Sequence, residues 1–349
     1  MIKKPKILHC PFNNGNFSWV LSRAERKLGF QSDLAVFYPH QFYPRNYDFK
    51  FNIGYLSFPN EWRRLKFLLW AVKNYDVFHF SYGSSILDHP FWFTNHLDFV
   101  LLKRYRKKII VTYQGDDARQ KDYFIENFDE DIYDSPLRLQ DRYYDLQKRL
   151  RIKKVDKFAQ TIFALNPDLL NVLPKRTRLL PYASIDISLV KPIYRQNKTL
   201  NIIHAPSDRF RKGTAEIIRI VKELSQDFPL KLSLVENMSL QKAWPIYQKA
   251  DIAIDQIKVG WYGSFAVEMM ALGKPVIAFL RKSDMEKYVP YHRAIPIVNA
   301  GLDELKVALT LLLTNQKLRE KIGRKSRKYV EKYHNPVKIA KITTKEYLR

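Results

Sequence analysis

The sequence has little of what several protein classes depend on. Its 349 residues include one cysteine, Cys10, which excludes an intramolecular disulfide framework and a cysteine-based metal site and is compatible with a reducing cytoplasm. No apolar run reaches the roughly 18–20 residues that a membrane-spanning helix needs. The chain begins with Met-Ile-Lys-Lys-Pro, and the apolar run that follows is too short for the core of a signal peptide. We therefore expect a cytoplasmic protein that is soluble or bound peripherally to the inner face of the cell membrane.

Acidic residues are also scarce relative to basic ones. The chain has 35 Asp and Glu against 60 Lys and Arg, a formal net charge of +25, and residues 316–349 alone carry 12 Lys and Arg against 3 Glu. This balance indicates a polyanionic partner, such as nucleic acid, an anionic membrane surface or a phosphorylated ligand, and a solvated Lys-rich surface is the alternative for any single cluster. No helix-turn-helix, zinc-finger or RNA-binding signature is present, and this disfavours nucleic acid.

The order of apolar and amphipathic segments predicts the fold class. Strands are expected at 6–10, 33–38, 77–81, 109–113, 161–165, 200–205, 230–235, 251–257, 275–279 and 295–298. Helices are expected between them, including 18–28, 61–74, 97–106, 214–227, 240–249, 265–272 and 302–314. Nearly continuous apolar strands that alternate with helices are typical of α/β proteins with parallel sheets.

The alternation breaks once, in a polar segment with a proline and no clear period, 186–199. We interpret residues 1–186 and 200–332 as two doubly wound, Rossmann-like domains, joined by a linker at 187–199. In open α/β sheets the ligand lies outside the carboxyl ends of the strands. Both domains are therefore expected to face a central cleft.

The segment NIIHAPSDRFRKGTAEII in the second half is a candidate phosphate site. A strand precedes a loop with Arg209, Arg211 and Lys212, and Gly213-Thr214 opens a helix. Free N–H groups at a helix start beside cations favour phosphate binding. The segment is neither a nucleotide-triphosphate loop nor a GxGxxG motif, so a solvated basic turn is an equal alternative.

The segment DIAIDQIKVGWYGSFAVEMMALGKPVIAF holds a second candidate. Tyr262, Gly263 and Ser264 lead into a helix that carries one acid, Glu268. A carboxylate accepts hydrogen bonds from vicinal hydroxyls, and ribose is the usual partner of an acid in such folds. The two segments together suggest a nucleoside diphosphate. A local cap or salt bridge of Glu268 is the alternative.

The first half places polar residues after two predicted strands. In KKIIVTYQGDDARQKDY, Gln114, Asp117 and Arg119 follow the strand that ends at Tyr113, and they suit contacts to a sugar or a buried Asp117–Arg119 pair. In HCPFNNGNFSW, Gly15 lies in a polar loop that would let a ligand approach the backbone, although a plain turn is equally compatible.

These segments resemble a known family. TYQGDDAR, ALNPDLLNVLP, LLPYASID, HAPSDRFRKGT and GSFAVEMMALGKPVIAF have the order and spacing of GT-B-fold glycosyltransferases of family 4. The resemblance implies a hexosyl-type, mostly retaining enzyme that needs no cofactor and uses a UDP- or GDP-linked sugar as donor. It also implies an acceptor-binding first domain, a nucleotide-binding second domain, and a last helix, 333–349, that crosses back to the first domain.

Site residues carry over by position. Glu268 would hold the ribose hydroxyls, and Lys212 would neutralise the departing diphosphate with Arg209, although Ser207 stands where the family arginine lies. Gly263 and Ser264, between Tyr262 and the helix, would present backbone N–H groups, as would Gly213. Asp117 matches the acid of the family's His-Gly-x-Asp motif.

Two positions depart from the family pattern. Gly260 replaces the first acid of the paired-glutamate motif, and Gln114 replaces the motif histidine. A GT-B protein that only binds its ligand is therefore an alternative. No acidic pair of the DxD type lies near the phosphate candidates, so we expect no metal site and stabilisation of the leaving group by fixed donors.

Two segments mix aromatic and basic residues, 59–75 and 89–108. Such helices favour an anionic membrane surface, while an ordinary core stripe is the alternative. We expect a glycan or lipid-linked acceptor in cell-surface polysaccharide or glycolipid synthesis. A glycosyltransferase that acts on nucleic acid, or a nucleic-acid-binding protein, is the competing class.

Overall fold

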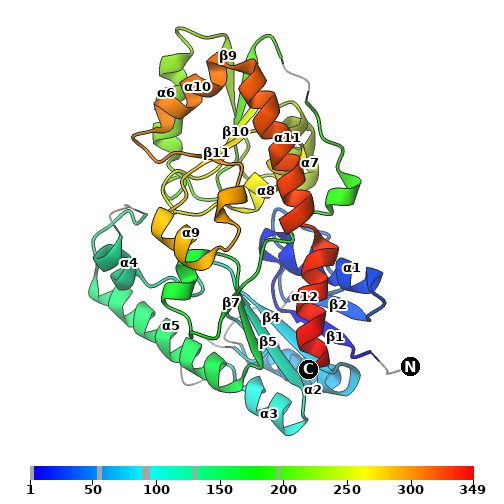
Figure 1. Cartoon of the computed structure of the whole chain (residues 1–349). Helices are drawn as coiled ribbons and strands as arrows, with labels where there is room; N and C mark the ends of the chain where they lie inside the picture. Colours follow the sequence, from blue (N-terminus) through cyan, green and yellow to red (C-terminus); the bar gives the residue numbers. More distant parts are fainter. Residues whose placement is uncertain (1–3, 53–56, 89–94, 129–131, 195–196) are drawn as a thin grey trace. The chain divides into compact units, whose positions relative to one another are not determined.

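The computed structural model describes residues 4–52, 57–88, 95–128, 132–194 and 197–349. The chain forms two compact units (Figure 1). Unit 1 comprises Met1–Asn127, Leu137–Ser184 and Pro336–Arg349, and unit 2 comprises Phe128–Pro136 and Ile185–Asn335. Within the described ranges, none of the helices has both the length and the apolar character needed to cross a membrane.

Unit 1 contains a seven-stranded parallel sheet in the order β3-β2-β1-β4-β5-β6-β7. Its strands are β1 (Ile7–Cys10), β2 (Ser32–Val36), β3 (Phe49–Lys50), β4 (Val77–Ser81), β5 (Lys108–Tyr113), β6 (Thr161–Ala164) and β7 (Arg178–Leu179). Its helices are α1 (Phe17–Lys27), α2 (Phe58–Asn74), α3 (Asp98–Arg104), α4 (Lys121–Asn127), α5 (Leu139–Phe158) and α12 (Pro336–Leu348), with short 3-10 helices at Asn14–Asn16 and Pro167–Asn171.

Alternate side chains of β4 show how the layers of unit 1 are built. Phe78 and Phe80 point into a core that includes Phe67 of α2 and Phe99 of α3. His79, between them, faces the opposite way, because its Nδ1 lies 2.6 Å from the Tyr347 hydroxyl of α12. Helices α2 and α3 therefore cover one face of the sheet, and the C-terminal helix covers the other beside α1.

Unit 2 contains a five-stranded parallel sheet in the order β12-β11-β10-β8-β9. Its strands are β8 (Leu200–His204), β9 (Leu230–Leu234), β10 (Ile252–Ile254), β11 (Val276–Ala278) and β12 (Val298–Asn299). Its helices are α6 (Thr214–Leu224), α7 (Leu240–Gln248), α8 (Ser264–Ala271), α9 (Lys282–Tyr288), α10 (Leu305–Thr314) and α11 (Gln316–Tyr333), with 3-10 helices at Ile187–Leu189 and His292–Ala294.

The predicted fold class is confirmed: both units are parallel α/β layers, and the last helix belongs to unit 1. Several predicted strands extend too far, among them 33–38 and 251–257. The run 251–257 is buried except at Gln256, yet β10 ends at Ile254, so Asp255 lies in the loop beyond the strand rather than inside it. Burial in a loop at the carboxyl edge of the sheet produced the same apolar pattern as a strand.

Candidate functional site

The strand order of unit 2 identifies where a ligand would bind. From β8 the sheet continues to β9 on one side and to β10 on the other. The carboxyl ends of β8 and β10 therefore flank the point at which the strand order reverses, and such points form crevices for ligands in open α/β sheets. Lys212 follows β8, and the turn at Gly263 follows β10. Two of the sequence-predicted segments thus meet at this edge.

A buried carboxylate that the sequence analysis did not single out joins these two segments. Asp255 accepts a hydrogen bond from Lys212 Nζ at 2.8 Å through Oδ1. Its Oδ2 accepts one from the Gly263 backbone N–H at 2.6 Å. The signal available in the sequence was an acid directly after an apolar strand, where α/β folds place functional groups.

Glu268 lies on α8, and its side chain is buried. Its Oε1 has no hydrogen-bond partner among the residues that the structure describes. Burial, together with the nearby charge of Asp255, raises the pKa of Glu268 to about 8, while Lys212 opposes the shift. The carboxyl group is therefore largely protonated at neutral pH, and one of its oxygens is unsatisfied. An unsatisfied buried polar atom of this kind needs a functional or solvent explanation.

The loop that carries Lys212 is held by local contacts. His204, at the end of β8, has Nδ1 2.8 Å from the Ile254 carbonyl oxygen and Nε2 2.9 Å from the Thr214 hydroxyl. Because a carbonyl only accepts, Nδ1 carries the proton and Nε2 accepts from Thr214. Gly213 has φ +70°, and a Cβ there would lie 2.4 Å from the Ile257 side chain. Only glycine fits this approach of the loop to the segment after β10.

Arg209 and Lys212 pair with different acids, Glu236 and Asp255. The Arg209 guanidinium forms two hydrogen bonds with the Glu236 carboxylate, at 2.8 and 2.7 Å, and its side chain is mostly exposed. A groove of about 520 Å³ opens beside it, lined by Arg209, Phe210, Ala215, Glu216, Ile218 and Lys258. This groove adjoins the start of α6, and its volume is within the range of small-molecule sites.

The turn after β10 is anchored through its aromatic residue. The Tyr262 hydroxyl lies 2.8 Å from the Tyr329 hydroxyl and 3.0 Å from His334 Nε2, and Tyr262 is buried. Ser264 is the first residue of α8, with Gly263 as the N-cap. Tyr262 therefore fixes the turn to α11, while Gly263 contacts Asp255.

Gly260 occupies the position at which the resembled family has an acid, and the structure explains the glycine. Its φ is +77°, and a Cβ there would lie 2.9 Å from the Arg281 guanidinium carbon. Arg281 pairs with Asp284 at 2.7 Å, and its guanidinium lies 3.7 Å from the centre of the Phe128 ring. The space that a glutamate side chain would need is filled by this arginine.

Three further candidates lie in unit 1, at the carboxyl edge of its own sheet. Asp117 accepts hydrogen bonds from the backbone N–H groups of Gln114 and Gly115, at 3.0 and 2.6 Å. Burial raises the pKa of Asp117 to about 6 against these N–H contacts. Arg119 bonds instead to Asp168 at 2.7 Å, so the alternative of a buried Asp117–Arg119 pair is wrong.

Gln114 and Gly15 complete the set in unit 1. The Gln114 side-chain nitrogen has no partner among the described residues, while the backbone carbonyl of Gln114 accepts a hydrogen bond from the Asn166 side chain at 2.6 Å. Gly15 has φ +57° in the turn between β1 and α1. That turn is closed by Asn16, whose Oδ1 accepts from Asn46 at 2.8 Å. These contacts support the interpretation of Gly15 as a turn glycine.

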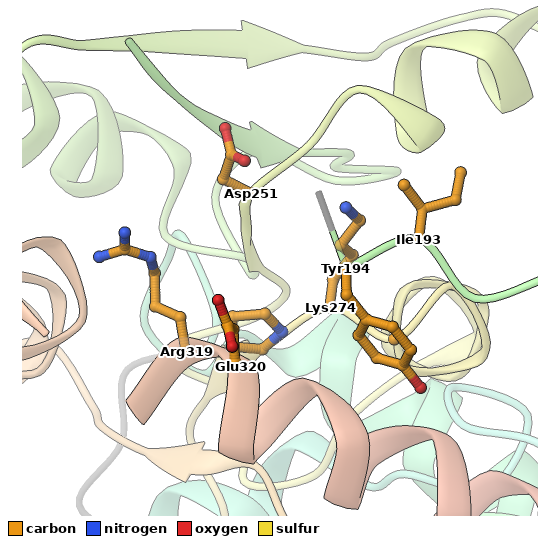
Figure 2. Close-up of a pocket in the computed structure, with 8 residues that line it drawn as sticks. Ile193, Tyr194, Asp251, Lys274, Arg319 and Glu320 are labelled. Carbon is orange, nitrogen blue, oxygen red and sulfur yellow. The ribbon is translucent and has the colours of Figure 1, made fainter. Parts of the chain in front are cut away.

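A small pocket in unit 2 lies at the opposite edge of the sheet (Figure 2). It is lined by Ile193, Tyr194, Asp251, Gly273, Lys274, Pro275, Arg319 and Glu320. Asp251 and Pro275 directly precede β10 and β11, so the pocket lies at the amino ends of the strands. Its volume of about 10 Å³ is no more than one water needs. We do not assign a ligand to it.

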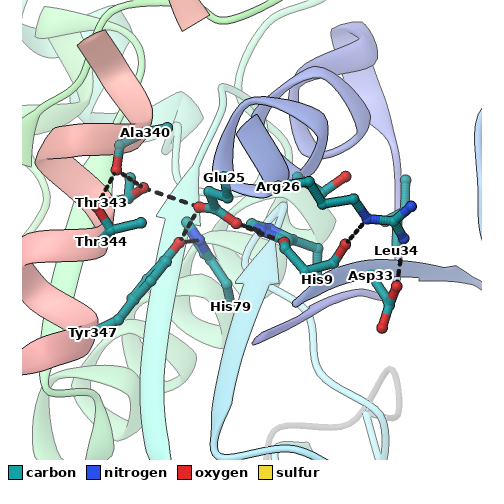
Figure 3. Close-up of polar contacts among 12 residues, drawn as sticks. His9, Glu25, Arg26, Asp33, Leu34, His79, Ala340, Thr343, Thr344 and Tyr347 are labelled. Atoms are coloured by element: carbon teal, nitrogen blue, oxygen red, sulfur yellow. Dashed lines mark hydrogen bonds and ion pairs between the residues drawn. The ribbon is translucent and has the colours of Figure 1, made fainter. Parts of the chain in front are cut away.

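One group of side chains in unit 1 has the composition of a metal site. The nearest ligand atoms of His9, Glu25 and His79 lie within 4.8 Å of one another, and all three residues are buried. Glu25 already accepts four hydrogen bonds, from His9 and Ser32 on Oε2 and from Thr343 and Tyr347 on Oε1 (Figure 3). His79 bonds to Tyr347 and Thr112. These contacts use the lone pairs that a metal would need, and they attach α12 to α1 and to the sheet.

Comparison with known proteins identifies the fold. No family model matches the sequence, and no curated protein matches it. Among solved structures, sucrose-phosphate synthase from Thermosynechococcus elongatus superposes with a TM-score of 0.68 at 16% identity, covering 99% of this chain and 98% of that one. The Anabaena protein HepE in complex with UDP-glucose gives 0.63 at 13% identity and 99% of both chains. A UDP-N-acetylglucosamine 2-epimerase gives 0.58 at 13% identity, over 99% and 96%. The chain therefore has the GT-B fold.

Proposed function

We propose that the protein is a glycosyltransferase of family 4 that transfers a sugar from a nucleoside diphosphate to an acceptor. The observation that carries the proposal is the meeting of Lys212, Asp255, the Gly263 turn and Glu268 at the switch point of the second sheet. A cation beside a helix start suits a diphosphate. Glu268 Oε1, which lacks a partner in the described part of the chain, suits a ribose hydroxyl, which would donate to it and replace the hydration lost on burial.

The charges at the site support a leaving-group role for Lys212. When the bond between the anomeric carbon and the diphosphate oxygen breaks, negative charge develops on the diphosphate. A fixed ammonium in a buried site stabilises that charge without reorganisation. We therefore propose that transfer needs no metal, and from the family resemblance alone we propose retention of configuration. A rate unchanged by a chelator such as EDTA would support the first point, and analysis of the product's anomeric configuration tests the second.

A thermal-shift screen against UDP-, GDP-, ADP- and CMP-linked sugars tests the donor site. A ligand that binds only the folded state raises the melting temperature, by an amount that grows with its concentration relative to Kd. We expect one nucleotide to stabilise the protein with and without its sugar. If no nucleotide sugar and no free nucleoside diphosphate produces a shift, the proposal is wrong.

A protein that binds the nucleotide sugar without transferring it is the second candidate, and Gly260 favours it. The family acid at this position usually contacts the transferred sugar, and here the guanidinium of Arg281 fills that space. Product analysis with the donor found in the screen separates the two candidates. Binding without transfer or hydrolysis, across glycan and lipid-linked acceptors, would establish the binding protein.

The exposed face of α2 supports a membrane-bound acceptor. Phe58 is 86% exposed, Trp62 51% and Leu69 45%, so these apolar side chains lie mainly outside the core. Trp70, 40% exposed, packs in part against the buried Phe67. Arg63, Lys66 and Lys73 are exposed on the same helix, and Lys66 Nζ lies 5.3 Å from the centre of the Trp62 ring. Large apolar side chains flanked by cations insert at the surface of anionic bilayers. We propose that this face binds the membrane that carries a lipid-linked acceptor.

Sedimentation with liposomes tests the surface of α2. We expect the wild type to bind vesicles that contain anionic lipid and to bind neutral vesicles weakly. Trp62→Ala with Phe58→Ala removes apolar contact, and we expect roughly a tenfold or larger loss, since burying such side chains contributes about 1.5–3 kcal/mol each. Leu189→Ala, also highly exposed but on unit 2, is the control. Equal binding by all three proteins would contradict the membrane assignment.

The segment 89–94, part of the second aromatic and basic stretch, lies outside the described residues.

A further inference from the structure

Asp255 is fully buried, and both its oxygens are committed to elements that the proposed site depends on. Oδ1 accepts from Lys212 Nζ at 2.8 Å, and Oδ2 accepts from the Gly263 N–H at 2.6 Å. Lys212 belongs to the loop after β8, and Gly263 to the turn that starts α8. One carboxylate thus links the two halves of the switch-point crevice, and it is not a residue that the family resemblance assigns.

We propose that Asp255 is the positioning residue of this site, holding the Lys212 ammonium and the Gly263 turn in the geometry that receives a diphosphate. The proposal rests on the proposed function. An ammonium has three N–H donors, so one bond to Asp255 leaves the others for a ligand. A long, flexible lysine side chain otherwise loses rotamer entropy when it binds. Fixing it in advance reduces that cost at the moment of binding.

The same contact changes what the site can bind. Because the Gly263 N–H is already bonded to Asp255, it is not a direct phosphate donor, in contrast to the expectation from the sequence. The negative charge of Asp255 offsets the positive charge of Lys212, and Glu268 lies near this pair. The crevice therefore presents a fixed ammonium without a large excess of positive charge. This favours recognition of the diphosphate by geometry rather than by net charge.

Asp255→Asn tests the proposal, with Asp251→Asn as a matched control. Asp251 directly precedes β10, the strand that Asp255 directly follows, so it lies at the opposite edge of the sheet. It is also buried and accepts hydrogen bonds from the backbone N–H groups of Asn201, at 2.7 Å, and Asn197, at 3.1 Å. Calorimetry with the nucleoside diphosphate found in the screen, and with the same nucleoside without phosphate, is the measurement. We expect Asp255→Asn to weaken diphosphate binding about tenfold or more, on the scale of one charge-assisted contact. Binding of the nucleoside, and both affinities of Asp251→Asn, should change less than about twofold, well under one such contact.

A double variant provides a second test and covers an Asp255→Asn chain that does not fold. Lys212→Met with Asp255→Asn removes both partners, so no buried charge is left alone. If Asp255 acts through Lys212, the double variant binds the diphosphate within about twofold of Lys212→Met, because the two losses are not additive. Additive losses, or an equal loss of nucleoside and diphosphate binding by Asp255→Asn, would overturn the proposal. Unchanged diphosphate affinity of Asp255→Asn would also overturn this proposal, but it would leave the proposed function intact. A wild type that binds no nucleotide refutes the proposed function and this proposal together.

Discussion

Two buried glutamates show how the two units use the same side chain differently. Glu25 of α1 and Glu268 of α8 are both almost inaccessible to solvent. Glu25 accepts hydrogen bonds from His9, Ser32, Thr343 and Tyr347. Glu268 has an oxygen without a described partner and is close to the Lys212–Asp255 pair. A satisfied buried carboxylate stabilises the fold, whereas an unsatisfied one beside a charge pair is a candidate for ligand binding.

Removing the satisfied carboxylate should have the largest effect. Glu25→Ala removes the acceptor of His9, Ser32 and Tyr347, while Thr343 keeps its bond to the Ala340 carbonyl, and it removes the buried contacts that join α12 to α1. We expect a loss of about 3–5 kcal/mol in the free energy of unfolding, as for breaking a buried pair. Urea denaturation is the measurement. Glu286→Ala, which removes an exposed acid from α9, should change stability by less than about 0.5 kcal/mol. A Glu25→Ala protein as stable as this control would show that the network does not hold α12.

The unsatisfied site should respond in activity. We expect Lys212→Ala to lower turnover roughly 100-fold, about 2.7 kcal/mol, as for the loss of one charge-stabilising donor. Lys274→Ala is the matched control, because Lys274 is also buried in unit 2 but lies at the amino edge of the sheet. Steady-state kinetics compare the two. Near-normal turnover of Lys212→Ala would remove this residue from the mechanism.

The raised pKa of Glu268 should make the free energy of unfolding depend on pH. This pKa is about 8 in the folded protein, above its ordinary value of 4.5, so the folded state retains a proton that the unfolded state releases. Stability therefore falls as the pH rises from about 4.5 to 8. Glu268→Gln has no such proton, and we expect it to gain about 2 kcal/mol relative to wild type between pH 6 and pH 8. Parallel pH profiles of wild type and variant in thermal unfolding would contradict the raised pKa.

The smallest effect is expected within the network of Glu25. Tyr347→Phe deletes one hydroxyl that bonds to Glu25 Oε1 at 2.8 Å and to His79 Nδ1 at 2.6 Å. We expect a loss of about 1–2 kcal/mol, because Glu25 keeps its other donors. His79 stays neutral, since burial lowers its pKa well below the ordinary value. Urea denaturation checks the loss, and a cost equal to that of Glu25→Ala would show that the tyrosine dominates the network.

Local patterns predicted the fold well, because parallel strands are short apolar runs. The strands β3 and β7 have only two residues each, too few to produce a pattern. The helix α5 was not recognised because its 20 residues are mostly charged or polar and give a weak apolar period.

The site was only partly predictable. Lys212 and Glu268 are predictable because each is a charged residue near a predicted helix start. Asp255 is not, because it lies within an apolar run that predicts a buried strand. The contacts of Glu25 join residues 318 and 322 positions apart, which no local pattern reveals. Arg209 is a basic residue next to a helix start whose side chain binds an acid instead, because its partner Glu236 lies in the loop after the neighbouring strand.

A crystal structure of the protein with the nucleoside diphosphate from the screen tests the central claim most directly. We predict that the diphosphate contacts Lys212 Nζ and that a ribose hydroxyl lies within hydrogen-bond distance of Glu268 Oε1. Asp255 should remain bonded to the Gly263 N–H. A nucleotide bound elsewhere, with Lys212 and Glu268 unchanged and without contact to it, would contradict the assignment of this crevice.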